Sequence, residues 1–115
     1  MSSLSELQQR LRDFAAERDW DQFHSPKNLS MALSVEAAEL VEHFQWLTEE
    51  QSKSLGRTEL AKVRLEAADV FIYLLRLADK LGIDLFEAAA EKMTLNAQKY
   101  PATRVRGDPR KSTDY

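Results

Sequence analysis

The sequence predicts an all-α fold, built as a four-helix bundle in a single domain. The chain has 115 residues, of which 43% are hydrophobic, so it is long enough for one compact core but too short for two ordinary domains. Helix-forming residues dominate, with only three Gly and three Pro. No stretch has the alternating Val, Ile and Thr that are typical of a half-buried strand.

The first helix is predicted at residues 4–18, where apolar residues recur every three or four positions and form one stripe of an amphipathic helix. These residues are Leu4, Leu7, Leu11 and Phe14. Residues 19–24 lack this period. The second helix is predicted to begin at Ser25 and Pro26, because serine caps helix N-termini and proline suits the first helical position. It is expected to run to about Leu47.

The second half of the chain is predicted to hold two more helices. Residues 48–58 are polar and predict a connection that includes a short helical turn. The third helix is predicted at residues 59–80, followed by Gly82, which suits the left-handed conformation after a helix. Asp84, with a glutamate three residues later, predicts the start of the fourth helix, which Pro101 brings to an end.

Apolar residues surround most of the circumference of the second and third helices, so both are expected to be largely buried. This pattern predicts that the central pair is covered by the other helices or by another subunit. It favours a homo-oligomer, either a dimer or a tetramer. Residues 1–101 are expected to form the domain, and residues 102–115 a basic C-terminal tail.

Composition and charge disfavour several classes of function. The absence of cysteine removes disulfides, zinc–thiolate sites and thiol nucleophiles. No segment reaches the roughly 18 uncharged apolar residues of a membrane span, and none resembles a secretion signal, so a cytoplasmic protein without membrane partners is expected. The formal net charge of -3 and the acidic residues within the tail disfavour nucleic acid as a partner.

Two helices each carry a pair of acidic residues three positions apart. Glu36 and Glu39 lie on the second helix, and Glu66 and Asp69 on the third, so each pair projects from one helix face. Asp69 shares its face with apolar residues, where an unpaired charge is costly. A magnesium ion would compensate such a cluster, because it takes oxygen ligands and shares its shell with substrate phosphates. Zinc is disfavoured, since cysteine is absent and the two histidines are not at a ligand spacing.

Simpler interpretations of these residues stay open at this point. Acidic pairs on helices are commonly solvated surface residues, and Asp69 could instead pair with Lys62 or Arg76. His43, one turn beyond Glu39, is either a support for the metal ligands or an ordinary surface or core histidine.

Several blocks of the sequence resemble the MazG-like all-α NTP pyrophosphatases, whose signature is Glu-x-x-Glu on one helix and Glu-x-x-Asp on the next. Residues 36–39 and 66–69 fill that pattern, and the chain is similar to the dCTP pyrophosphatase subgroup over roughly residues 10–105. The other blocks are Glu17-Arg18-Asp19-Trp20, Phe23-His24-Ser25-Pro26-Lys27-Asn28-Leu29, Phe44-Gln45-Trp46, and Lys92-Met93 with Asn96 and Lys99-Tyr100-Pro101.

The resemblance implies a reaction and its site residues. Water would attack the α phosphorus of a nucleoside triphosphate, giving the monophosphate and pyrophosphate, with Mg²⁺ bridging the triphosphate and helping to activate the water. The ion would be held by Glu36, Glu39, Glu66 and Asp69. The substrate would be met by His24, Trp20, Trp46, Lys27, Lys92, Asn96 and Tyr100. Active sites in this family are shared between subunits, so these residues need not all meet within one chain.

Alternatives remain for the substrate residues and for the function. Trp46 could fill the core instead of stacking on a base. Lys92, Asn96 and Tyr100 follow one another at one-turn intervals, so they either line one groove or form a solvated polar face. The connection before the third helix is shorter than in some members of the subgroup, which leaves the substrate open. A broad-specificity house-cleaning NTP pyrophosphatase and a non-catalytic helical interaction module are the two alternative functions.

Overall fold

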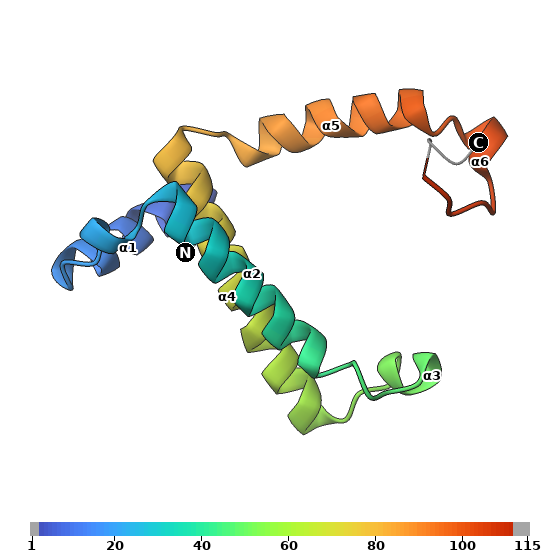
Figure 1. Cartoon of the computed structure of the whole chain (residues 1–115), viewed down its shortest axis with the longest axis horizontal. Coiled ribbons are helices and arrows are strands. Elements are labelled where there is room, and N and C mark those ends of the chain that lie inside the picture. Colours follow the sequence, from blue (N-terminus) through green and yellow to red (C-terminus); the bar gives the residue numbers. More distant parts are fainter. Residues whose placement is uncertain (1–2, 112–115) are drawn as a thin grey trace. The chain divides into compact units, whose positions relative to one another are not determined.

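The computed structural model describes residues 3–111, and all of their regular structure is helical (Figure 1). The elements in chain order are α1 (Leu4–Glu17), the 3-10 helix η1 (Asp21–Phe23), α2 (Pro26–Glu42), α3 (Glu49–Ser52), α4 (Arg57–Leu81), α5 (Leu85–Lys99) and α6 (Ala102–Val105). The predicted all-α class is confirmed. None of the helices in this range is long and apolar enough to cross a membrane.

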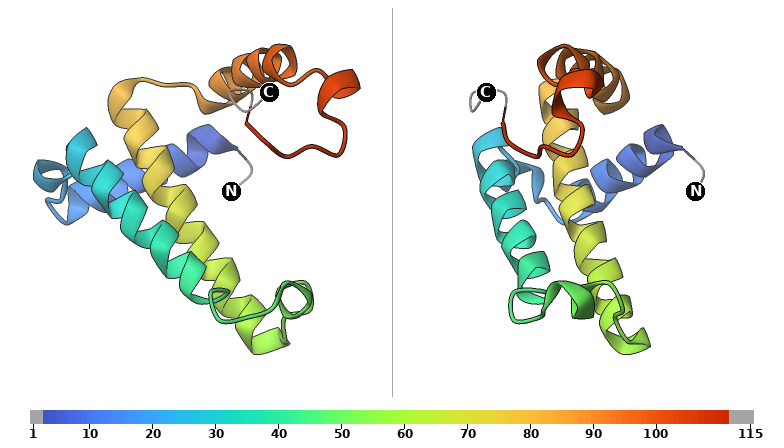
Figure 2. Two further views of the ribbon diagram at one scale, coloured as in Figure 1. Left: turned by 45° about the vertical axis from the view of Figure 1, so that its right-hand side comes forward. Right: turned by 90° about the vertical axis from the view of Figure 1, so that its right-hand side faces the viewer.

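Two compact units make up the chain, Met1–Gly82 and Ile83–Tyr115. In the first unit, α2 and α4 run antiparallel and lie side by side, as both views of Figure 2 show. α1 packs against α4, and α3 lies in the connection between α2 and α4 (Figure 1). The first unit therefore holds three of the four long helices that the sequence predicts. The bundle that they would form with the fourth stays a prediction.

The core of the first unit is formed by side chains of α1, α2 and α4. The buried apolar residues are Ala15, Leu29, Leu75 and Ala78. Leu29 and Leu75 are the largest side chains among those that are fully buried, and the two alanines let the helices approach closely. Arg76 lies within the same stretch of α4 and is only 4% exposed. This packing holds the end of α1, and the segment that follows it, against α4.

The ends of the helices follow the sequence signals. The Ser25 hydroxyl accepts a hydrogen bond from the backbone N–H of Asn28 at 3.1 Å, which caps α2 as predicted. Thr48 and Gln51 form a reciprocal capping box at the start of α3. Gly82 follows α4 with a φ of 67°, the left-handed conformation that glycine adopts without strain. Local capping chemistry therefore determines where these elements begin and end.

The predicted end of the second helix, at about Leu47, is wrong, because α2 ends at Glu42. Beyond it, the N–H of Phe44 bonds to the carbonyl of Val41 at 2.9 Å, and the N–H of Leu47 bonds to that of Phe44 at 2.9 Å. These bonds span three residues rather than four, so the chain passes through turns. The backbone of Thr48 is extended, with a φ of -73° and a ψ of 164°, because it caps the next helix.

The second unit contains α5 and α6. The Asp84 carboxylate accepts a hydrogen bond from the N–H of Glu87 at 3.1 Å, so it caps α5 where the sequence predicts a helix start. The predicted tail includes the single turn of α6, followed by an ion pair between Asp108 and Arg110 at 2.6 Å. Residues 112–115 of that tail lie outside the described residues.

Large apolar side chains of α2 and α4 remain exposed. Met31 and Val35 lie one turn apart on α2, and Phe71 and Leu74 lie three residues apart on α4. The expected burial of these two helices is therefore not reached within the first unit, since α1 packs on only part of α4. Cover by a second subunit stays a prediction.

Candidate active site

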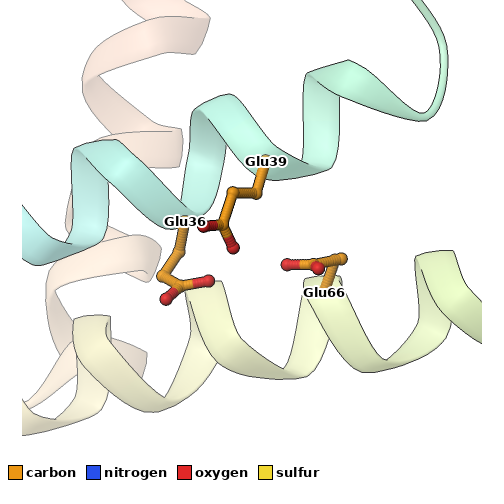
Figure 3. Close-up of side chains that lie close together, drawn as sticks. All are labelled: Glu36, Glu39 and Glu66. Atoms are coloured by element: carbon orange, nitrogen blue, oxygen red, sulfur yellow. The ribbon is translucent and has the colours of Figure 1, made fainter.

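Three glutamates meet between α2 and α4. Glu36 and Glu39 project from α2 towards α4, and Glu66 projects from α4 towards α2 (Figure 3). One carboxylate oxygen of each lies within 4.8 Å of those of the other two. The three-residue spacing puts the two acids of α2 on one face, and the antiparallel pairing brings Glu66 opposite them. The structure therefore brings together three of the four predicted metal ligands, here called the glutamate cluster.

The glutamate cluster has too few hydrogen-bond donors for its oxygens. Oε2 of Glu36 and Oε2 of Glu66 are buried and have no hydrogen-bond partner among the described residues. A buried polar atom without a partner costs about 1–3 kcal/mol and is rare in folded proteins. Two such carboxylate oxygens in one cluster fit the oxygen ligands that a hard divalent cation such as Mg²⁺ prefers.

The electrostatics of the glutamate cluster agree with this interpretation. Burial raises the pKa of Glu36 to about 7, and the hydrogen bond and charge of Glu39 contribute next. The pKa of Glu66 is also raised, first by burial and then by the negative charges of Glu39 and Asp69. A bound cation would act in the opposite direction, because it favours the ionised carboxylates.

No Lys or Arg side chain pairs with these glutamates within the described part of the chain. Lys62 pairs with Glu59 at 3.3 Å, and Arg76 pairs with Asp21 at 2.9 Å. The interpretation in which Lys62 or Arg76 is the partner of Asp69 is therefore wrong. Each of these two cations pairs with an acid outside the glutamate cluster, so neither forms the salt bridge that would take the place of a metal ion.

His43 lies beside the glutamate cluster. Its Nε2 is 4.0 Å from Oε1 of Glu66, and its Nδ1 is 3.8 Å from Oε2 of Glu59. Its charge acts to lower the pKa of Glu66, against the stronger effect of burial. His43 is thus placed to support a ligand of the site and is not itself part of the cluster.

The fourth predicted ligand, Asp69, is exposed and lies outside the glutamate cluster. It does not occupy the desolvated position that the sequence indicates. Its charge still raises the pKa of Glu36 and Glu66, so it acts on the cluster electrostatically. Asp69 also lines a cavity of about 330 Å³, together with Trp20 and His24. It therefore connects the glutamate cluster to an aromatic cavity in the same unit.

This aromatic cavity is walled mainly by apolar side chains. The rings of Phe14 and Trp20 meet edge to face with centroids 5.7 Å apart, and the rings of Trp20 and His24 are 6.3 Å apart. The other lining residues are Leu11, Ala15, Asp69, Ile72, Tyr73 and Arg76. Apolar walls with a few polar groups are typical of small-molecule sites, and this volume suits a flat heterocyclic ring.

His24 is held in the cavity wall by Arg76. Nη2 of Arg76 lies 3.2 Å from Nδ1 of His24 and donates to Oδ1 of Asp21 at 2.9 Å. Burial lowers the pKa of His24, and the positive charge of Arg76 lowers it further, against the opposite effect of Asp21. The imidazole is therefore neutral at neutral pH.

Several residues of the aromatic cavity are not predicted from the sequence. Phe14 belongs to the apolar stripe of the first helix, which predicts core packing equally well. Tyr73 lies four residues after Asp69, and this one-turn spacing is the signal that would have placed it beside the site. No sequence pattern indicates the contact of Arg76 with His24, because their positions are 52 residues apart.

The remaining predicted substrate residues are not part of this cavity wall or belong to the second unit. Trp46 follows α2 and is 87% exposed, so it does not fill the core of the first unit. Lys27 is exposed in the first turn of α2. The other three belong to the second unit, where Lys92 and Asn96 are exposed on α5 and Tyr100 caps its end. Their place around a substrate stays a prediction.

Comparisons with known proteins converge on one group. The model of the MazG-like family matches residues 31–114. dCTP pyrophosphatase 1 of Homo sapiens is 42% identical over 114 residues, which cover 97% of this chain and 67% of the human protein. The Mus musculus protein of the same name is 43% identical over 114 residues, with the same coverage of 97% and 67%. A solved pyrophosphatase from Archaeoglobus fulgidus matches with a TM-score of 0.80 and 42% identity, covering 84% of this chain and 91% of that chain.

Proposed function

Because the chain belongs to the MazG-like family, we propose that it is a nucleoside triphosphate pyrophosphohydrolase that converts dCTP, or a modified dCTP, to the monophosphate and pyrophosphate. The names of the human and mouse relatives support dCTP as the substrate. The observation that carries the proposal is the glutamate cluster of Glu36, Glu39 and Glu66, with two buried oxygens that lack a partner among the described residues.

Magnesium is the proposed cofactor. Glu36, Glu39 and Glu66 would hold it, with Asp69 as the fourth acidic residue of the site. When bound, the ion would supply positive charge against the triphosphate and a Lewis acid that activates water. The three carboxylates, which lie between α2 and α4, would hold that charge. Phosphoryl transfer depends mainly on positioning and charge neutralisation, so the site requires no nucleophilic side chain.

The aromatic cavity is the proposed site for the base. Trp20 offers an aromatic surface, and His24 offers a hydrogen bond to the edge of the ring. Asp69 lines the cavity and influences the glutamate cluster, so base and phosphates would be bound at neighbouring places on α4. The other residues proposed to bind the nucleotide, as the family resemblance implies, are Lys27, Trp46, Lys92, Asn96 and Tyr100.

A homo-oligomer with shared active sites is the proposed assembly. The exposed apolar side chains of α2 and α4, Met31, Val35, Phe71 and Leu74, would be covered by another subunit. Trp46, which is 87% exposed, would then reach the aromatic cavity or the phosphates of a neighbouring chain. Light scattering of the purified chain measures this directly, and a monomer at micromolar concentration would contradict it.

The decisive experiment is pyrophosphate release from a panel of canonical and modified dNTPs and NTPs, with Mg²⁺ and with a chelator. Release from dCTP or its 5-modified analogues that requires Mg²⁺ is the expected result. The matched control is Glu49→Gln, which changes an exposed glutamate of α3 and should leave release unchanged.

The same panel separates the alternatives. Similar rates on several bases would point to a broad house-cleaning enzyme and contradict the dCTP preference. No release from any nucleotide, together with a Tm that does not respond to Mg²⁺, would point to a non-catalytic helical interaction module.

A further inference from the structure

Arg76 is an unusual residue for a helix core. At 4% exposure it is the only buried charged or polar residue among those that the structure describes. Its Nε is buried and has no hydrogen-bond partner in that range. A buried donor without an acceptor lowers stability, so the energetics of folding alone do not explain an arginine at this position.

The guanidinium of Arg76 is fixed in place from two elements. It donates to Asp21 of η1 at 2.9 Å and lies 3.7 Å from Asp79 on its own helix. Asp79 is held in turn by Arg12 of α1 at 2.7 Å, and Asp21 by Lys80 at 3.0 Å. This set of five residues, here called the ion-pair network, leaves the guanidinium little freedom to turn away from His24.

The contact with Arg76 determines which nitrogen of His24 carries the proton. An arginine side chain has only donors and stays protonated at every accessible pH. Nδ1 of His24, 3.2 Å from Nη2, must therefore accept this hydrogen bond. In a neutral imidazole the single proton then resides on Nε2. His24 lines the aromatic cavity, so Nε2–H is the group that its ring has left for a ligand.

We propose that Arg76 is a positioning residue that locks His24 in the Nε2–H tautomer, so that the cavity presents a hydrogen-bond donor and selects ligands with an acceptor at that place. Cytosine carries such an acceptor at its ring nitrogen N3, which in uracil carries a proton, whereas the carbonyl oxygen O2 is an acceptor in both bases, so N3 is the atom by which a donor would select cytosine. The choice of a nucleotide as ligand rests on the proposed function, but the tautomer lock does not. Without the lock, both tautomers would be populated and the ring would also accept from a donor.

Arg76→Met is the variant that tests this proposal. It keeps an unbranched side chain in the core and removes all donors. Asp79 would keep Arg12 as a partner, and Asp21 would keep Lys80, so no carboxylate of the ion-pair network loses its last cation. Lys80→Met is the matched control, since it removes one ion pair of the same network while Arg76 keeps its contacts with Asp21, Asp79 and His24.

The first measurement is an imidazole ¹H–¹⁵N correlation spectrum of the nucleotide-free protein at about pH 8, above the ordinary histidine pKa of about 6.5. The chain has two histidines, and a His43→Gln variant assigns their signals. The Nε2–H tautomer alone is expected for His24 in the wild type and in Lys80→Met, and a mixture in Arg76→Met. A mixture in the wild type, or a pure Nε2–H form in Arg76→Met, would overturn the lock.

The second measurement is steady-state hydrolysis of dCTP and dUTP. Arg76→Met should raise KM for dCTP about tenfold, leave kcat within about threefold, and reduce the preference for dCTP over dUTP about tenfold, as expected for loss of one oriented hydrogen bond. Lys80→Met should change none of these. A fall in kcat with unchanged KM and unchanged preference would overturn the selective role. A wild type with a locked His24 that hydrolyses no nucleotide would instead refute the proposed function and leave the lock standing.

Discussion

Helix α4 carries two clusters of charge that differ in how their acids are neutralised. Around Glu66 the glutamate cluster brings three carboxylates together, and no Lys or Arg pairs with them in the described range. Nearer the end of the helix, the ion-pair network combines acids and bases in alternation. Its members are Arg12, Asp21, Arg76, Asp79 and Lys80.

The pKa shifts of the two clusters have opposite signs. A hydrogen bond from Arg12 is the main cause that lowers the pKa of Asp79, and one from Lys80 is the main cause that lowers that of Asp21. In the glutamate cluster, burial and neighbouring charges raise the pKa of Glu36 and Glu66. Acids with lowered pKa values contribute to folding, whereas acids with raised values are costly until a cation binds. The direction of the pKa shifts, more than the number of acids, therefore distinguishes a ligand site from a structural network.

The largest expected effect is on catalysis, and it should be confined to the glutamate cluster. Glu39→Gln should reduce pyrophosphate release by more than about a hundredfold, because it removes a proposed metal ligand and ligands matter more than their supporting residues. The fold should persist, since the change also removes a like charge. Circular dichroism and the pyrophosphate assay measure the two expectations. Lys80→Met, in the ion-pair network, should release pyrophosphate at a rate within about threefold of that of the wild type. Full activity of Glu39→Gln would contradict the metal-site assignment.

Unfolding free energies should change in opposite directions when one acid is neutralised in each cluster. Asp79→Asn breaks a pair with Arg12, which is half exposed, and should lower the free energy of unfolding by about 1 kcal/mol. Glu36→Gln relieves repulsion and should leave it unchanged or raise it, provided that metal is absent. Urea titrations with a chelator present give both values. A loss of the same size in Glu36→Gln would show that the glutamate cluster stabilises the fold as the network does.

The sequence predicts much of the fold because local signals determine the helix boundaries. Ser25, Thr48 and Gly82 act through their own side chains or backbone, so their effects are visible without tertiary information. The end of α2 was not predictable in this way. Apolar residues such as Phe44 continue the helical pattern through a stretch where the backbone has already changed to turns.

The glutamate cluster was predictable because a fixed spacing on two neighbouring helices brings its members to one place. Glu36 and Glu66 are found by this logic, and Asp69 only in part, since its exposure depends on how far the helices cover each other. The aromatic cavity depends on α1 packing across α4. No pattern within either helix predicts that Phe14 and Arg76 meet in its wall.

The pH dependence of stability should differ between the two clusters. The pKa of Glu36 in the folded protein is about 7, above its ordinary 4.5, so the folded state holds the proton more tightly and stability should fall as pH rises between these values. The pKa of Asp79 lies below its ordinary 3.8, so its contribution is present above that pH and is lost as pH falls through the lower value. Thermal unfolding measured against pH, with a chelator present, should show a Tm that falls both towards neutral pH and towards acid pH.

One variant tests each of these two pH effects. Glu36→Gln should remove the fall in Tm towards neutral pH, and Asp79→Asn should reduce the fall in Tm towards acid pH. Excess Mg²⁺ should reduce the fall towards neutral pH, because a cation favours the ionised form of Glu36. A Tm that rises steadily up to neutral pH without metal would mean that the glutamates are not destabilising when ionised.

The smallest expected effect comes from His43, which borders the glutamate cluster without joining it. At 4.0 Å from Glu66 it lowers the pKa of that carboxyl only weakly against the effect of burial. His43→Asn should therefore raise the pKa of Glu66 further, but it should change the apparent affinity for Mg²⁺ by no more than about threefold, because the charge that it removes acts on the proton and on the metal ion in the same direction. This is below the 10–100-fold loss typical of well-aligned supporting residues. Activity measured against Mg²⁺ concentration gives this value. A loss of activity as large as that expected for Glu39→Gln would mean that His43 is itself a metal ligand.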